Sequence, residues 1–147
     1  MMRPAHARDL RKGRWSEAGR IYLVTAVTRD RRPVFYGLHP ARVLIQTLRS
    51  EETQGRAKTL AFVVMPDHLH WLLQLGAGSD LSEVVRAVKA VSAKRLGRPL
   101  WQRGFHDHAL RQDEDLVAAA RYVIANPLRR VLVNRVADYP HWDAVWV

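Results

Sequence analysis

The sequence predicts an α+β domain in which helices cover an antiparallel β-sheet. Three observations carry this prediction. The chain has 147 residues, of which 48% are hydrophobic, and this is enough for one domain with a substantial core. Short runs of β-branched and aromatic residues alternate with longer stretches whose apolar residues recur at helical spacing. No internal repeat or low-complexity tract interrupts this order in the sequence.

The first part of the chain predicts one strand and one helix. Residues 21–28 are β-branched and aromatic, which is typical of a strand, and the charged turn of residues 29–33 follows them. Residues 40–52 predict a helix, because Pro40 suits a first helical turn and apolar-face positions follow at helical spacing. These positions are Val43, Leu44, Thr47 and Leu48.

The middle of the chain predicts two strands and a second helix. Residues 60–65 and 68–75 are strand-like, and a Pro-Asp turn or bulge separates them. Residues 81–96 predict a helix that Ser79 or Asp80 can cap and that a Gly-Arg-Pro sequence ends. Its apolar stripe consists of Leu81, Val84, Val85, Val88 and Val91.

The last predicted elements are a fourth strand and a third helix. Residues 101–111 are a plausible strand. Asp113 opens a helix from residue 116 to about 125, with acidic residues at its positively polarised N-terminal end. Pro127 disfavours a helical conformation at Asn126, so the helix is expected to end there. The first six elements read βαββαβ, the ferredoxin-like arrangement, to which the C-terminal helix is added.

Composition points to the class of partner. The formal net charge of +10 and the pI near 11.0 favour a polyanion such as nucleic acid over a generic basic surface or an acidic membrane. Most cations are arginines, whose planar group fits phosphate oxygens. The lack of cysteine excludes disulfides, thiolate metal sites and cysteine nucleophiles. Neither a signal peptide nor a membrane-spanning run is evident, so a cytoplasmic protein is expected.

A histidine pair lies within an apolar strand-like run. His68 and His70 are two residues apart, so a strand places both on one face and Leu69 and Trp71 on the other. A pair of histidines on a half-exposed strand without special partners is the alternative. Because the flanking residues are almost purely apolar, the free-energy cost of burying two polar rings there must be offset by partners. A divalent metal would be such a partner.

A second histidine pair competes with the first. His106 and His108 also fall in a predicted strand, and they could form the metal site, a second wall of the same site, or DNA-facing polar groups. Their neighbours Arg103, Asp107 and Arg111 are polar, which suits an exposed strand face. We therefore expect the first pair to hold the metal.

Tyr122 and Asn126 are one helical turn apart and share a helix face. Taken singly, they suit a core tyrosine and a helix-terminating turn residue. Together with the histidine pair they indicate a metal-assisted attack of the tyrosine on a phosphodiester. A tyrosine hydroxyl is a weak nucleophile at neutral pH and needs a Lewis acid at a phosphodiester. The side-chain oxygen of Asn126 and the two histidines would form a mixed nitrogen and oxygen site suited to Mg²⁺ or Mn²⁺.

These motifs resemble the single-tyrosine HUH transposases, most closely the branch of REP-associated tyrosine transposases. The match spans roughly residues 10–135, nearly the whole predicted domain. The family's best-known transposases carry glutamine one turn after the tyrosine, whereas this chain has Asn126, as is typical of the REP-associated branch. The segments that carry the resemblance are residues 11–16, 21–28, 101–108 and 121–130, together with His68-Leu69-His70.

The resemblance implies an endonuclease and strand-transferase that acts on single-stranded DNA at hairpin-forming repetitive palindromes. Tyr122 would attack the phosphate to form a 5′-phosphotyrosine link, and His68, His70 and Asn126 would hold the metal. The resemblance also implies a nucleoid-associated monomer, with a dimer as the alternative. The residues expected to contact DNA are Arg8, Arg11, Lys12, Arg14, Trp15, Arg103, Arg129 and Arg130.

The predicted organisation is a basic arm over residues 1–19, an HUH endonuclease domain over 20–135 and a tail over 136–147. Two other functions remain open from the sequence. One is a domesticated, non-catalytic protein that binds DNA hairpins, and the other is a nuclease that uses metal-activated water. Trp15, Trp71 and Trp101 could belong to the core, although Trp15 beside the basic arm could stack on an unpaired base.

Overall fold

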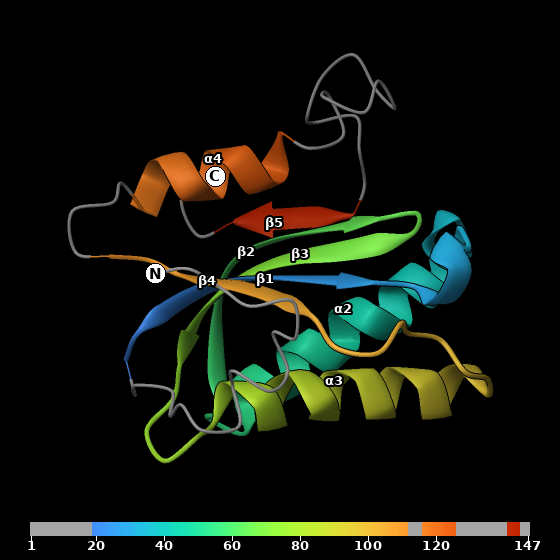
Figure 1. Ribbon diagram of the computed structural model, residues 1–147, viewed down its shortest axis with the longest axis horizontal. Helices are drawn as coiled ribbons and strands as arrows, with labels where there is room; N and C mark the ends of the chain where they lie inside the picture. Colours follow the sequence, from blue (N-terminus) through green and yellow to red (C-terminus); the bar gives the residue numbers. More distant parts are fainter. Residues whose placement is uncertain (1–18, 112–115, 126–140, 145–147) are drawn as a thin grey trace.

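The computed structural model describes residues 19–111, 116–125 and 141–144, which form a five-stranded antiparallel sheet with helices on both faces (Figure 1). The strand order is β4-β1-β3-β2-β5, so the first four strands have the order expected for a βαββαβ arrangement. The α+β, ferredoxin-like prediction is therefore confirmed. The strands are β1 (Ile21–Val27), β2 (Ala57–Met65), β3 (His68–Leu75), β4 (His106–Ala109) and β5 (Trp142–Ala144).

The helices form two layers around the sheet. Figure 1 shows α2 (Leu38–Thr53) and α3 (Leu81–Leu96) on one face and α4 (Leu116–Ile124) on the other. Two short 3-10 helices, η1 (Arg29–Arg31) and η2 (Val34–Tyr36), connect β1 to α2. None of the helices that the structure describes has the length and apolarity needed to cross a lipid bilayer.

Strand alternation divides the apolar side chains between two cores. On β3, Leu69, Trp71 and Leu73 belong to the large core under α2 and α3. Leu72 points to the opposite face, where it joins a smaller core with Val123 and other residues of α4. Because successive strand residues face opposite sides, the even-numbered positions of β3 belong to the α4 face of the sheet.

The ends of α3 follow the sequence signals closely. The Asp80 carboxylate accepts a hydrogen bond from the backbone N–H of Ser82 at 3.1 Å, which selects Asp80 over Ser79 as the N-cap. At the other end Gly97 adopts φ 70°, a left-handed conformation that favours glycine at a helix C-terminus. The predicted bounds of this helix are confirmed.

Two strand predictions near the sheet edges were wrong. The predicted strand over 101–111 is shortened to β4, and Trp101 forms only an isolated bridge with Thr28. Between them Gly104 has φ 78°, and the carbonyls of Gln102 and Gly104 accept hydrogen bonds from the Lys89 ammonium, so they do not join a sheet ladder. The backbone conformation at Gly104 and the Lys89 side chain thus delay the start of the strand to His106.

The second error was the omission of β5 from the predicted C-terminal tail. Its three residues pair with β2, which places Trp142 opposite Val63 at the far edge of the sheet from β4. Three residues are too few to show a period-two pattern in the sequence, so only the contact with β2 reveals the strand.

His141, immediately before β5, makes this edge sensitive to acid. The residue is 7% exposed, and its carbonyl accepts a hydrogen bond from Val64 N–H at 2.8 Å. Burial, assisted by the positive charge of Arg42, lowers the pKa of the His141 imidazole below its ordinary value of 6.5. The unfolded chain therefore binds a proton at a higher pH than the folded chain does. The contribution of His141 to the free energy of unfolding is therefore fully present above about pH 6.5, and it is lost as the pH falls through the folded-state pKa.

We expect the unfolding free energy of His141→Gln to decrease less than that of the wild type between about pH 7 and pH 5. Urea denaturation across this range measures the slope, and His39→Gln, at an exposed position of α2, is the matched control. An equal pH slope for the His141 variant and the control would contradict a role of His141 in acid sensitivity.

Candidate active site

The first histidine pair lies on the sheet face that α4 covers. His68 begins β3 directly after the Pro66-Asp67 turn, and the strand register places it opposite Val27 of β1 and His70 opposite Thr25. Leu69 and Trp71 are buried in the core on the other face. The prediction that the two histidines share one face is thus confirmed.

The two imidazole rings are held at a fixed mutual angle. Their centroids are 4.8 Å apart, and their planes meet at 83°. The Nδ1 atom of His68 lies 2.7 Å from Asp67 Oδ1, and that of His70 lies 2.9 Å from Thr25 Oγ1. Because both Nδ1 atoms have these partners, Nε2 is the nitrogen through which each ring would coordinate an ion. A hydrogen-bond acceptor behind the ring, most often a carboxylate, a backbone carbonyl or a water, is the usual support of a metal-binding imidazole.

Asp67 connects the pair to a cation at the surface. Its Oδ2 atom lies 3.2 Å from the Nε atom of Arg31, which is more than half exposed. Burial by itself raises the pKa of the Asp67 carboxyl, but the hydrogen bond from His68 and the charges of His68 and Arg31 outweigh it, so the net pKa is lowered. The carboxylate therefore stays ionised at neutral pH and can accept a hydrogen bond from a protonated Nδ1 of His68.

His68 and His70 could supply two of the ligands of a divalent ion. Among the described residues, no third His, Cys, Asp or Glu joins His68 and His70 in a group that could hold a metal. Asn126, the predicted oxygen ligand, lies outside the described residues. The two imidazoles could supply two nitrogen ligands to a divalent ion, and their Nδ1 partners would fix the orientation of both rings.

Tyr122 is on the exposed side of α4. It is 55% exposed, whereas its neighbours Ala120, Val123 and Ile124 are buried against the sheet. The alternative interpretation of Tyr122 as a core tyrosine is therefore wrong. An accessible phenol is a requirement for a nucleophile that must meet a DNA strand.

The second histidine pair lies on the same sheet face as the first. His106 of β4 is opposite Thr25 of β1, and Thr25 is in turn opposite His70 of β3. Directly opposed residues point to the same face, so these three residues form a row across three strands. His106 and His108 are exposed, and Asp107 between them is buried on the other face. This placement suits both a second wall beside the first pair and polar groups that face DNA.

The predicted DNA contacts fall mostly outside the described part of the chain. Arg103 is described and is exposed. It lines a groove of about 560 Å³ together with Arg29, Arg86 and Lys89, three cations that the sequence alone did not indicate as DNA contacts. Trp71 and Trp101 are buried, as expected for core residues. The remaining predicted DNA contacts, which lie outside the described residues, are Arg8, Arg11, Lys12, Arg14, Trp15, Arg129 and Arg130.

The sequence carried a partial signal for this groove. Arg86 and Lys89 are three residues apart, which places them on one side of a helix. Arg29 and Arg103 are far apart in the sequence, so their proximity depends on the bridge between Thr28 and Trp101. Only the folded chain shows that all four cations line one groove.

Comparison with known proteins agrees with this architecture. A solved structure of a REP-associated tyrosine transposase bound to a REP hairpin matches with a TM-score of 0.77 and 25% identity, over 88% of this chain and 79% of that one. A REP-associated tyrosine transposase of Escherichia coli is 33% identical over 82 residues, which are 54% of this chain and 50% of that protein. A relative from Haemophilus influenzae is 28% identical over 100 residues, 57% of each chain.

The chain spans about half the length of the curated relatives that it matches. The model of the IS200-like transposase family matches residues 19–123, from the residues before β1 into α4. This segment contains the histidine pair, the helices on both faces of the sheet and Tyr122. Because the match covers most of the sequence and every element of the βαββαβ arrangement, the chain belongs to the family of IS200-like transposases.

Proposed function

We propose that the protein is a metal-dependent endonuclease and strand-transferase that acts on single-stranded DNA beside hairpin-forming palindromes. The observation that carries this proposal is the His68 and His70 pair, with each Nδ1 atom held by a neighbouring side chain. Family membership and the likeness to a transposase bound to a REP hairpin support the choice of substrate. The net charge of +10 suits a polyanion.

In the proposed reaction Tyr122 is the nucleophile. Its hydroxyl oxygen forms a bond to the phosphorus, the bond from phosphorus to the 3′ oxygen breaks, and the strand remains attached as a 5′-phosphotyrosine. The phenol loses its proton and the departing 3′ oxygen gains one, so a free 3′-hydroxyl results. A divalent ion, when bound by His68, His70 and Asn126, would stabilise negative charge on the scissile phosphate.

Detection of the covalent protein–DNA intermediate tests the proposed reaction directly. We expect the protein, given Mn²⁺ and a single-stranded oligonucleotide that folds into a hairpin, to form an adduct that survives denaturing electrophoresis. Mass spectrometry of proteolytic peptides should locate the DNA on Tyr122. A failure to form any adduct across a panel of palindromes and their flanks would contradict the enzymatic proposal and favour a protein that only binds hairpins.

The side chains behind the histidines should tune metal affinity. We expect Thr25→Val and Asp67→Asn each to weaken Mn²⁺ binding about 10–100-fold, because each removes or neutralises the partner of an Nδ1 atom. Isothermal titration measures the affinity. Asp30→Asn, at an exposed carboxylate on the neighbouring turn, is the matched control.

If Thr25→Val and Asp67→Asn both bound Mn²⁺ as the Asp30 control does, Thr25 and Asp67 would not support the metal ligands. Circular dichroism of each variant shows whether the fold is kept, so a loss of affinity can be separated from a loss of structure.

A further inference from the structure

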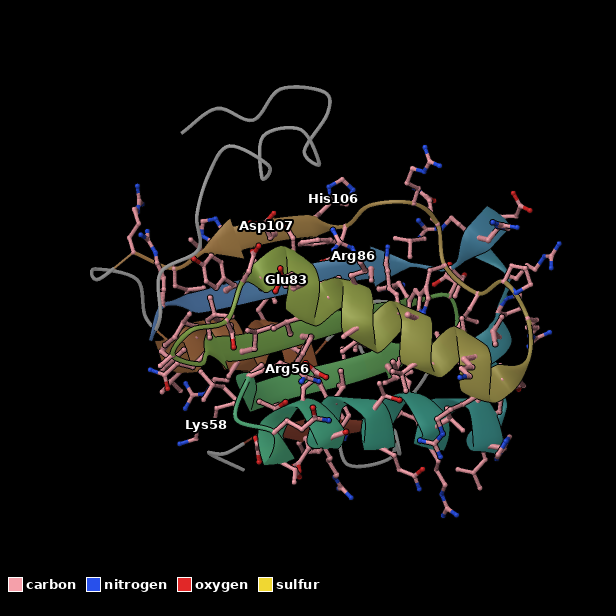
Figure 2. The ribbon with its side chains drawn as sticks, turned by 90° about the horizontal axis from the view of Figure 1, so that it is seen from below. Arg56, Lys58, Glu83, Arg86, His106 and Asp107 are labelled. Carbon is pink, nitrogen blue, oxygen red and sulfur yellow. The ribbon has the colours of Figure 1, made fainter. Side chains whose placement is uncertain are left out.

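A cationic groove runs along α3, on the sheet face opposite the histidine pair. Its walls are the N-terminal half of α3 and the segment from Trp101 to Phe105 that leads into β4. Figure 2 shows α3 alongside β4, with Arg86 labelled on the helix and His106 at the start of the strand. The groove has a volume of about 560 Å³, within the range of about 300–1,000 Å³ that is typical of ligand sites.

The charges of the groove favour an anion. Four cations line it, Arg29, Arg86, Lys89 and Arg103, against one carboxylate, Asp80. That carboxylate accepts the hydrogen bond that caps α3. The guanidinium groups of Arg29, Arg86 and Arg103 form no ion pair within the residues that the structure describes. Like charges gathered around a concave surface repel one another, so an anionic ligand would stabilise the arrangement.

The walls of the groove are held in place by hydrogen bonds. The Lys89 ammonium donates to the Gln102 carbonyl at 2.8 Å and to the Gly104 carbonyl, which ties α3 to the opposite wall. Trp101 Nε1–H donates to Ser92 Oγ at 2.9 Å, and Arg29 N–H donates to the Leu100 carbonyl at 3.0 Å. Lys89 is thus mainly structural, and the three arginines are the groups presented to a ligand.

We propose that this groove binds the phosphate backbone of DNA through Arg29, Arg86 and Arg103. The proposal rests on the proposed function in taking DNA as the substrate, and it assigns to DNA a second surface, remote from the histidines. Arginine's planar donors suit phosphate oxygens, and half-buried Phe105 offers an apolar contact to a sugar or base. A strand that follows the groove past Phe105 reaches His106 on edge strand β4, next to the row of His70 and Thr25.

A pair of charge-matched double variants tests this assignment. Arg86→Gln with Arg103→Gln removes two positive charges from the groove, and Arg49→Gln with Lys58→Gln removes two from exposed positions elsewhere. Figure 2 shows Lys58 at the opposite side of the molecule from His106. The probe is a fluorescent DNA hairpin with a short single-stranded 5′ flank, and anisotropy measures its affinity.

We expect the groove variant to bind the hairpin about tenfold or more weakly than the control variant does. The slope of log affinity against log salt should fall by about 0.7–0.9 for each phosphate that the variant no longer neutralises, and by less in the control. Equal affinities and equal salt slopes for the two double variants would overturn the proposal.

A thiol probe provides an independent measurement. The chain has no cysteine, so Gln102→Cys places a unique thiol at an exposed position of the groove wall. The hairpin should slow its alkylation by a maleimide at least about fivefold at saturation, since bound DNA would cover the groove. Ser50→Cys on α2 should react at the same rate with and without DNA. Equal protection at both positions, or at neither, would overturn the proposal.

The outcome separates this proposal from the proposed function. If the wild-type protein forms the tyrosine adduct but the groove variant binds like its control, the groove assignment fails and the enzyme stands. If no adduct forms but Gln102→Cys is protected and the groove variant binds weakly, the enzymatic proposal fails and the groove stands.

Discussion

The Tyr122→Phe variant is expected to form no covalent adduct with single-stranded DNA. Phenylalanine keeps the ring and removes only the hydroxyl that would bond to phosphorus. Because the residue is 55% exposed, the change should leave the core and the stability of the fold nearly unaltered. Strand cleavage should fall by about a thousandfold or more, while hairpin affinity should stay within about twofold.

Tyr36→Phe is a suitable control for this experiment, since Tyr36 is 82% exposed and lies in η2, on the connection from β1 to α2. The control should form the adduct at the wild-type rate. Substantial cleavage by Tyr122→Phe without an attached protein would contradict the tyrosine mechanism and support a nuclease that uses metal-activated water.

Replacing either histidine of the first pair should strongly weaken both metal binding and cleavage. His68→Ala and His70→Ala each remove one nitrogen ligand, so Mn²⁺ affinity should fall by about a hundredfold or more and adduct formation with it. Calorimetry measures the metal affinity, and denaturing electrophoresis measures the adduct. His68 is 4% exposed, so His68→Asn is a smaller change that keeps a polar group beside Asp67 if alanine lowers stability too far.

The second histidine pair is the matched control for the first. His106→Ala with His108→Ala alters exposed residues of β4 on the same sheet face. This double variant should bind Mn²⁺ nearly as the wild type does. A stronger loss of metal affinity in this variant than in His70→Ala would move the metal site to β4.

The elements that the sequence predicted well have strong local signals. The helix over 81–96 is bounded by Asp80, whose carboxylate can cap it, and by Gly97, which can adopt a positive φ. The strand over 68–75 is an apolar run that follows a Pro-Asp turn. The positions of His68 and His70 on one face follow from strand alternation alone.

The predictions that failed concern contacts between distant segments. The strand over 101–111 was predicted too long because the hydrogen bonds from Lys89 to the Gln102 and Gly104 carbonyls have no local signal. The strand β5 was missed because it consists of three residues that only β2 stabilises. Whether Tyr122 was buried could not be decided, because its alanine-rich and valine-rich helix offered more than one apolar face.

The sequence by itself determined the order of the elements, the basic character of the chain, and the histidine and tyrosine motifs, since these depend on residue type and local periodicity. Only the tertiary structure decided which side chains from distant segments lie beside these motifs. Strand register brings Thr25 to His70, 45 residues further along the chain, and aligns His106 with the same row. The bridge between Thr28 and Trp101 brings Arg29 to Arg103. Such pairings depend on long-range hydrogen bonds and packing, which leave no periodic signal in the sequence.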